Sequence, residues 1–192
     1  TGLTNGVSYT FTVTATNSAG ESMASSESDS VTPKGNQTIT FSNPGDQDFG
    51  TELTLTASAS SGLAVTFTSE TPEICTVTSD GKVTFLKVGT ATIKASQDGN
   101  AAYNPATPVT WSFNVNAVKP GVPTDFVVTP GDGQLTLTWT APANTGGSPI
   151  TDYEYSINDG TWVRTGSTGT SYTLTGLTNG TSYTVKVRAV NA

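Results

Sequence analysis

The sequence TGLTNGTSYTVKVRAVN at residues 175–191 occurs a second time, as TGLTNGVSYTFTVTATN, at residues 1–17. Aligned without gaps, 12 of the 17 positions are identical, and the two copies begin 174 residues apart. Repetition at a fixed period indicates an architecture built from repeated units. Because the chain of 192 residues begins and ends inside one motif, we expect it to be a window of a longer repeating array.

Each copy alternates apolar and polar residues, which is typical of a half-buried β-strand. In the first copy Tyr9 and Phe11 share one face with further apolar residues, and threonines occupy the other face. Residues 22–32 follow as a more polar strand, whose Ser and Glu content suits the edge of a sheet. Pro33 ends that strand, because proline has no N–H to donate to a neighbour. We therefore predict a strand at residues 7–17 and a second one after it.

Composition excludes several classes of function. The net charge is −7, and the eight Lys and Arg residues are scattered, whereas a phosphate-binding surface needs clustered cations. Nucleic acid and anionic membranes are therefore not expected as partners, and no apolar run is long enough to span a bilayer. Histidine, the commonest general base and metal ligand, is absent. We expect no enzymatic activity, no cofactor and no metal site.

The rest of the chain shows the same strand periodicity, in two units separated by proline- and glycine-rich joints. In residues 35–118 the predicted strands are 37–41, 53–58, 65–68, 74–78, 82–85, 90–95 and 109–116. In residues 119–192 they are 124–129, 134–140, 150–157, 161–165, 171–175 and 182–190. The longest connector, APANTGGSP at 141–149, is predicted to be flexible. Short strands at close spacing predict all-β tandem sandwiches of antiparallel sheets.

Residues 119–192 resemble a bacterial fibronectin type III domain. The resemblance rests on LTLTW at 135–139, PITDY at 149–153, and the alternating strand that follows Leu177 and includes Tyr183. It implies that Trp139 fills the core and that Leu177 and Tyr183 form the tyrosine corner of the family. The last strand of such a domain, strand G, is missing here.

Residues 1–34 resemble that missing end, strands F and G, with Leu3 and Tyr9 at the corner positions. Residues 119–191 and 18–34 together number 90, the usual length of the family's domain. Adding the 84 residues of 35–118 gives 174, the repeat offset. We therefore expect one repeat unit to be a fibronectin type III domain plus one other sandwich.

Residues 35–118 resemble a bacterial immunoglobulin-like repeat of large surface proteins. The resembling segments are QTITF at 37–41, ASASSGLAVTF at 57–67, GTATI at 89–93 and GNAAYN at 99–104. Some relatives in that family carry a cysteine pair at the positions of Cys75 and Ala91. Since the second position is alanine here, that crosslink cannot form, and Cys75 is expected to be a small core residue rather than a reactive thiol.

Few residues suggest a ligand site, and for each we favour a structural role. Exposed aromatic residues would form a sugar-stacking platform, with Trp162 the best candidate, but core packing explains most of them, including Trp111. Turn aspartates would bind calcium only at a higher density of oxygen ligands than the sequence offers. The candidates are Trp111, Tyr153, Tyr155 and Trp162 for sugars, and Asp46, Asp48, Asp80, Asp98 and Asp132 for calcium.

These patterns predict a structural repeat segment of an extracellular bacterial surface protein or filament, which acts as a spacer, stalk or fibre. The alternative is an accessory spacer or glycan-binding module of a secreted polysaccharide-degrading enzyme or adhesin. Expected partners are neighbouring repeats or copies of the same chain, joined end to end, and a glycan or surface protein in the adhesive alternative. If the natural chain ends near Ala192, residues 22–32 of a neighbouring copy would complete the open edge of the last sheet.

Overall fold

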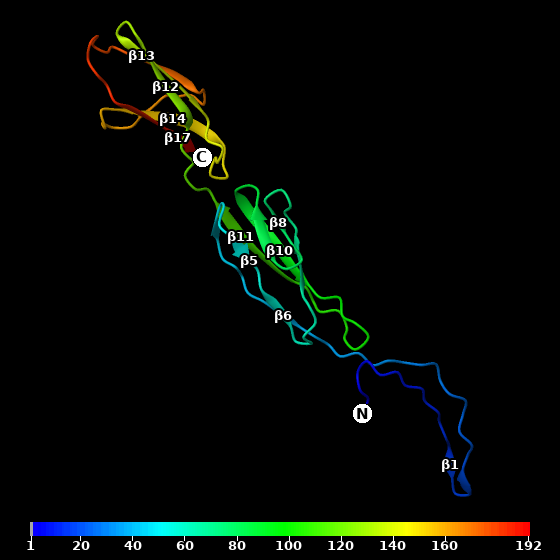
Figure 1. Ribbon diagram of the computed structural model, residues 1–192. Helices are drawn as coiled ribbons and strands as arrows, with labels where there is room; N and C mark the ends of the chain where they lie inside the picture. Colours follow the sequence, from blue (N-terminus) through cyan, green and yellow to red (C-terminus); the bar gives the residue numbers. More distant parts are fainter. Residues whose placement is uncertain (1) are drawn as a thin grey trace.

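Three β-structured parts follow one another end to end in the computed structural model, which describes residues 2–192 (Figure 1). They are an N-terminal hairpin at residues 2–34, a central unit from β3 to β11, and a C-terminal unit from β12 to β17. The residues that the structure describes contain strands and turns but no helix. The prediction of an all-β chain of tandem sandwiches is confirmed.

The N-terminal hairpin departs from the two regular strands predicted for it. Only its tip forms a ladder, between β1 (Thr16–Asn17) and β2 (Gly20–Glu21). Further along, Ser22, Ser25 and Ser28 each make two bonds to one residue of the opposite arm: the serine N–H donates to its carbonyl, and the serine Oγ accepts from its N–H. The serine arm thus advances three residues for every two of its partner. That spacing breaks the two-residue period of a regular strand.

The apolar face of this hairpin is largely exposed. Leu3, predicted as a core residue, is 46% exposed, and Phe11 is equally exposed. Within residues 2–192 no second sheet packs over this face, and a corner residue needs an opposite sheet to be buried. The core position of Leu3 therefore stays a prediction for a fibronectin type III domain that includes this hairpin.

The central unit contains three sheets. A four-stranded sheet has the order β4-β11-β10-β7, a three-stranded sheet has the order β5-β9-β8, and β3 pairs with β6. All pairs are antiparallel except β4 with β11, which is parallel and was not predicted. The bounds are β3 (Ile39–Phe41), β4 (Gln47–Asp48), β5 (Leu53–Thr54), β6 (Ala57–Ala59), β7 (Thr66–Ser69), β8 (Cys75–Val77), β9 (Lys82–Phe85), β10 (Gly89–Ser96) and β11 (Val109–Asn116).

The core of the central unit lies between its sheets and centres on β10. Alternate residues of that strand, Ala91, Ile93 and Ala95, are fully buried, because successive side chains of a strand point to opposite faces. Cys75 packs in the same cluster with no exposed surface. The thiol is therefore a core group.

The C-terminal unit contains two three-stranded sheets, with orders β12-β13-β16 and β15-β14-β17. Leu137, Trp139, Tyr153 and Leu174 form its buried core, so Trp139 lies where the resemblance placed it. The Trp139 Nε1–H is buried without a hydrogen-bond partner. The bounds are β12 (Thr124–Gly131), β13 (Gln134–Thr140), β14 (Ile150–Ile157), β15 (Val163–Arg164), β16 (Ser171–Thr175) and β17 (Val185–Asn191).

Truncation of Ile93 tests the core of the central unit. We expect Ile93→Ala to lower the free energy of unfolding by about 2–5 kcal/mol, because it leaves a cavity at a fully buried position. Reaction of the Cys75 thiol with a coloured thiol reagent along a denaturant series reports on this unit. The control is Leu86→Ala, at a largely exposed position of the same unit, which should change stability by less than about 0.5 kcal/mol. Equal effects of both substitutions would contradict the assigned core.

Candidate functional site

The described residues offer no group of three or more His, Cys, Asp or Glu side chains able to hold a metal ion. Among them there is also no helix of the length and apolar character that crossing a membrane requires. The features that remain for function are the contacts between the units, the tyrosine corners, and a cluster around Trp162.

The loop at 141–149 forms the contact between the central and C-terminal units. The N–H of Val118 donates to the carbonyl of Gly146 at 3.0 Å, and the N–H of Val88 donates to that of Gly147 at 3.2 Å. Val88 precedes β10 of the central unit, so this bond joins the two units directly. The connector that was predicted to be flexible is therefore bonded to both the linker and the central unit.

Two glycines make this approach possible. Gly146 and Gly147 have φ values of +75° and +84°, in the left-handed region that side chains disfavour. A Cβ on Gly147 would clash with the Phe49 ring, and one on Gly146 would clash with the Val118 carbonyl. The backbone of the loop can lie against the central unit only because neither residue has a side chain.

Asn191, the last residue of β17, stabilises the same junction through hydrogen bonds of its side chain. Its Nδ2 donates to the carbonyl of Val118 at 2.8 Å and to that of Thr145 at 2.9 Å. One amide group thus ties the strand end to the linker and to the loop. This role of Asn191 was not predicted from the sequence; the one signal for it is the same residue type at the equivalent position of the first copy, Asn17.

The junction between the N-terminal hairpin and the central unit also consists of backbone contacts. The N–H of Gly35 donates to the carbonyl of Ala102, and the N–H of Asn104 donates to that of Gly35, both at 2.8 Å. A Cβ on Gly6 would lie 2.8 Å from that of Ala102. Both junctions therefore combine backbone hydrogen bonds with a close glycine contact.

The tyrosine corner occurs twice, at positions related by the repeat. The N–H of Thr178 donates to the Tyr183 hydroxyl at 3.0 Å, and the N–H of Thr4 donates to the Tyr9 hydroxyl at 2.9 Å. Leu177 packs against the core of the C-terminal unit. Equal geometry at both ends indicates that the hairpin has the local structure of the corresponding part of the C-terminal unit.

Trp162 belongs to a charged cluster on the sheet β15-β14-β17. The Arg188 guanidinium lies 4.2 Å from the centre of the Trp162 ring, and its Nε donates to Glu154 Oε2 at 2.7 Å. Trp162 remains 37% exposed. One face of the ring is thus occupied by a cation–π contact.

The other aromatic residues do not assemble into a sugar platform with Trp162. Tyr153 is buried in the core, and Tyr155 stacks on Tyr172. Trp111 lies in the other unit, and its Nε1–H donates to the Phe41 carbonyl at 2.8 Å. Its 37% exposure corrects the prediction of a core position: Trp111 shares the inward face of β11 with Phe113, but lies at the rim of the sandwich.

Asp152 is a buried carboxylate that organises the turn after β15. Its Oδ1 accepts hydrogen bonds from the N–H of Tyr153, the Thr165 hydroxyl, and the N–H of Gly166 and of Ser167, at 2.7–3.3 Å. Burial raises the pKa of Asp152, but these hydrogen bonds outweigh burial and hold the pKa below its ordinary value. The carboxylate therefore stabilises the fold in its ionised form.

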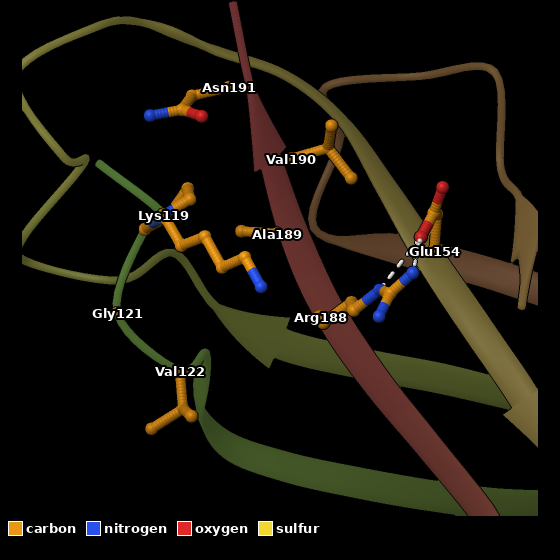
Figure 2. Close-up of a pocket in the computed structure, with 9 residues that line it drawn as sticks. Lys119, Gly121, Val122, Glu154, Arg188, Ala189, Val190 and Asn191 are labelled. Carbon is orange, nitrogen blue, oxygen red and sulfur yellow. Dashed lines mark hydrogen bonds and ion pairs between the residues drawn. The ribbon is translucent and has the colours of Figure 1, made fainter. Parts of the chain in front are cut away.

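A pocket of about 340 Å³ lies between the linker at 119–122 and the end of β17 (Figure 2). Figure 2 shows Lys119 and Val122 on the linker side, and Arg188 with its bonds to Glu154 on the strand side. The pocket follows the outer edge of a strand and has no facing cluster of catalytic side chains.

Substitution of Asp152 tests the role of its charge. We expect Asp152→Asn to lower the free energy of unfolding at pH 7 by about 1–3 kcal/mol, because hydrogen bonds to a charged acceptor are stronger. Since the folded-state pKa is depressed, this stabilisation is present above the unfolded pKa and is lost as pH falls through the folded pKa. The difference between the two proteins should therefore vanish at acidic pH. Asp159→Asn, at an exposed ion pair with Lys186, is the control and should cost less than about 1 kcal/mol.

Comparison with known proteins agrees with this architecture. Residues 121–192 match the family model "Fibronectin type III domain", and residues 63–101 match "Bacterial Ig-like domain". Domains of these families are typically non-catalytic modules of repeat-type structural proteins.

Several solved structures are similar to parts of the chain. "Titin kinase and its flanking domains" is 38% identical, with 39% of this chain and 15% of that chain covered and a TM-score of 0.33. A crystal structure of three titin domains is 21% identical, with 94% and 68% covered and a TM-score of 0.39. The FN1–FN3 domains of chicken CNTN1 are 17% identical, with 97% and 71% covered and a TM-score of 0.33. The chain thus spans only 15% of the first of these structures. Residues 121–192 are thus similar to a fibronectin type III domain, and residues 63–101 of the central unit are similar to a bacterial Ig-like domain.

Proposed function

We propose that this chain is a spacer segment of an extracellular bacterial surface protein or filament, which holds other parts apart by its length. In this proposal the domain boundaries lie near Lys34 and Val118. Residues 1–34 are then the end of a preceding fibronectin type III domain, residues 35–118 are an Ig-like domain, and residues 119–192 are the next fibronectin type III domain without its last strand.

The observation that carries the proposal is the bonded contact between units. A spacer keeps its two ends far apart only if its domains do not fold back on one another. A linker with two prolines restricts such bending. Here Pro120 and Pro123 stiffen the linker. The hydrogen bonds from Val88 to Gly147 and from Asn191 to Val118 restrict bending at this junction further. Such contacts favour one relative orientation, and repetition of a favoured orientation gives an extended array.

The surface also suits this role. The net charge of −7 keeps copies of an array apart in solution, and both matched families are commonly extracellular.

A second candidate is a glycan-binding module of an adhesin or a secreted polysaccharide-degrading enzyme. The observation in its favour is the exposed ring of Trp162, because sugars stack on exposed aromatic faces. Against it, Arg188 occupies one face of that ring, and the loop at 141–149 is bonded into the junction.

Substitution at Gly147 tests the spacer proposal. We expect Gly147→Ala to loosen the junction, because the new methyl group meets the Phe49 ring, without unfolding either sandwich. Small-angle X-ray scattering should show a broader distribution of maximum dimensions, and residual dipolar couplings should show that the two units no longer align as one body.

The matched control is Gly166→Ala. Gly166 also has a positive φ, of 71°, but a Cβ added there would have no atom within 4 Å. Both substitutions therefore add similar backbone strain of about 1–2 kcal/mol, and only one affects the junction. If the native chain already shows independent alignment of its units, the proposal of an orienting junction is wrong.

Glycan-array binding distinguishes the second candidate. The spacer proposal predicts that the intact chain binds no glycan on the array. Binding that is lost in Trp162→Ala but kept in Val163→Ala, its exposed neighbour, would instead establish the adhesive function.

A further inference from the structure

The loop at 141–149 meets the central unit at one end of a single sheet. Three adjacent strands of that sheet, β4, β11 and β10, have an end there. Phe49 directly follows β4, Val118 lies two residues after β11, and Val88 directly precedes β10. Because β4 runs parallel and β10 antiparallel to β11, these residues lie at the same end of the sheet. Val118 and Val88 donate hydrogen bonds to the loop, and the Phe49 ring lies against its Gly147.

β4 is the most weakly held of these three strands. It is only two residues long and lies at the edge of the sheet. It pairs in parallel with β11, Gln47 with Val115 and Asp48 with Asn116, and parallel pairing is slightly less stable per residue than antiparallel pairing. Segments with few contacts open locally while the rest of a protein stays folded. β4 therefore depends on further contacts to stay on β11.

Side-chain and backbone bonds on either side of this short pair supply part of them. Before it, the N–H of Asn114 donates to Asp46 Oδ1 at 2.8 Å, and Asn114 Nδ2 donates to Asp46 Oδ2 at 3.3 Å. After it, the N–H of Phe49 donates to the Asn116 carbonyl at 2.9 Å. The half-buried Phe49 ring packs against the core of the central unit and also against the backbone of Gly147. The residue that ends the β4 pairing is thus shared between two units.

The end of the sheet fits a partner that lacks side chains at two successive positions. A Cβ on Gly147 would lie 2.9 Å from the Phe49 Cβ and closer still to two carbons of its ring. A Cβ on Gly146 would lie 2.9 Å from the carbonyl carbon of Val118. A Gly-Gly pair is therefore the chemical feature that this surface recognises.

We propose that the loop at 141–149 is an end cap of the central unit's sheet, which holds β4 on β11. The cap covers the Phe49 ring and thereby keeps the Phe49 N–H on the Asn116 carbonyl. The pairing of β4 then depends on the C-terminal unit, and the stabilisation runs from one unit to the unit before it. This inference goes beyond the spacer function, because a junction can orient two units without stabilising either of them.

Hydrogen exchange of single amides in the 192-residue chain, measured by NMR, tests the end cap. We expect Gly147→Ala to speed exchange of the Phe49 and Asn114 N–H groups at least about tenfold, because β4 then leaves β11 more often. Both groups bond within the central unit, so a loop that only orients the units leaves their exchange unchanged. The N–H of Ser60, which donates to the Thr38 carbonyl beside the pair of β3 with β6, should keep its rate.

Two further variants serve as controls. Gly166→Ala adds the same kind of backbone strain with no atom near the new methyl group, and it should leave exchange at Phe49 and Asn114 unchanged. Phe49→Leu removes the ring that the methyl group on residue 147 would meet. In that background Gly147→Ala should speed exchange of the Asn114 N–H by less than about threefold, because residues in contact have non-additive effects.

Asn191→Ala loosens the loop without adding an atom, because it removes the bonds to Val118 and Thr145. It should speed exchange at Phe49 and Asn114 about threefold. This variant decides the question if Gly147→Ala unfolds the C-terminal unit, which the loss of the native Trp139 signals would show.

Unchanged exchange at Phe49 and Asn114 in a folded Gly147→Ala chain would overturn the end cap. The spacer proposal would then still stand or fall on the scattering and alignment data, so the two failures are distinguishable. Equal acceleration at Ser60 would also overturn the end cap, because the substitution would then act on the whole central unit rather than on β4.

Discussion

The close backbone contact between loop 141–149 and the central unit is the constraint on which the arrangement of this molecule depends. Two adjacent glycines let the loop lie against Phe49 and the linker, and their carbonyls accept hydrogen bonds from Val88 and Val118. Side chains at these positions would push the units apart. The orientation of one sandwich on the next is thus set by the absence of two side chains, in addition to the stiffness of a proline linker.

The polar and aromatic groups that suggest a site in the sequence are used for structure. The Asp152 carboxylate accepts four hydrogen bonds that stabilise a turn. Arg188 contacts both Glu154 and Trp162 on one face of a sheet. Tyr183 and Tyr9 each accept a bond that closes a corner. In each case a partner within the same unit already satisfies the group, which leaves little chemistry for a ligand among the described residues.

The two copies of the repeat have different surroundings, and this difference explains their different packing. Leu177 lies against the core of the C-terminal unit, whereas Leu3 and Phe11 face no second sheet in this structure. The local bonds of the corner are the same in both copies, because they join residues only five apart. Local hydrogen bonding therefore does not need the sandwich, but burial does.

Several features were predictable from the sequence alone. Alternation of apolar residues placed β9, β11, β13, β14 and β16 at their observed bounds, because a strand with one buried face must alternate at a period of two. The core position of Trp139 and the tyrosine corners followed from a family resemblance. The role of Asn191 was not predicted, although the repeat has asparagine at the equivalent position, Asn17.

Other features were decided only by the tertiary structure, because they depend on partners that are distant in the sequence. Periodicity could not place the parallel pairing of β4 with β11, whose residues lie 68 positions apart, nor the rim position of Trp111. It also missed the serine arm, where hydroxyls take the place of regular ladder bonds. Above all, the glycines of loop 141–149 indicated flexibility in the sequence, whereas in the fold the same lack of side chains lets the loop bind the neighbouring unit.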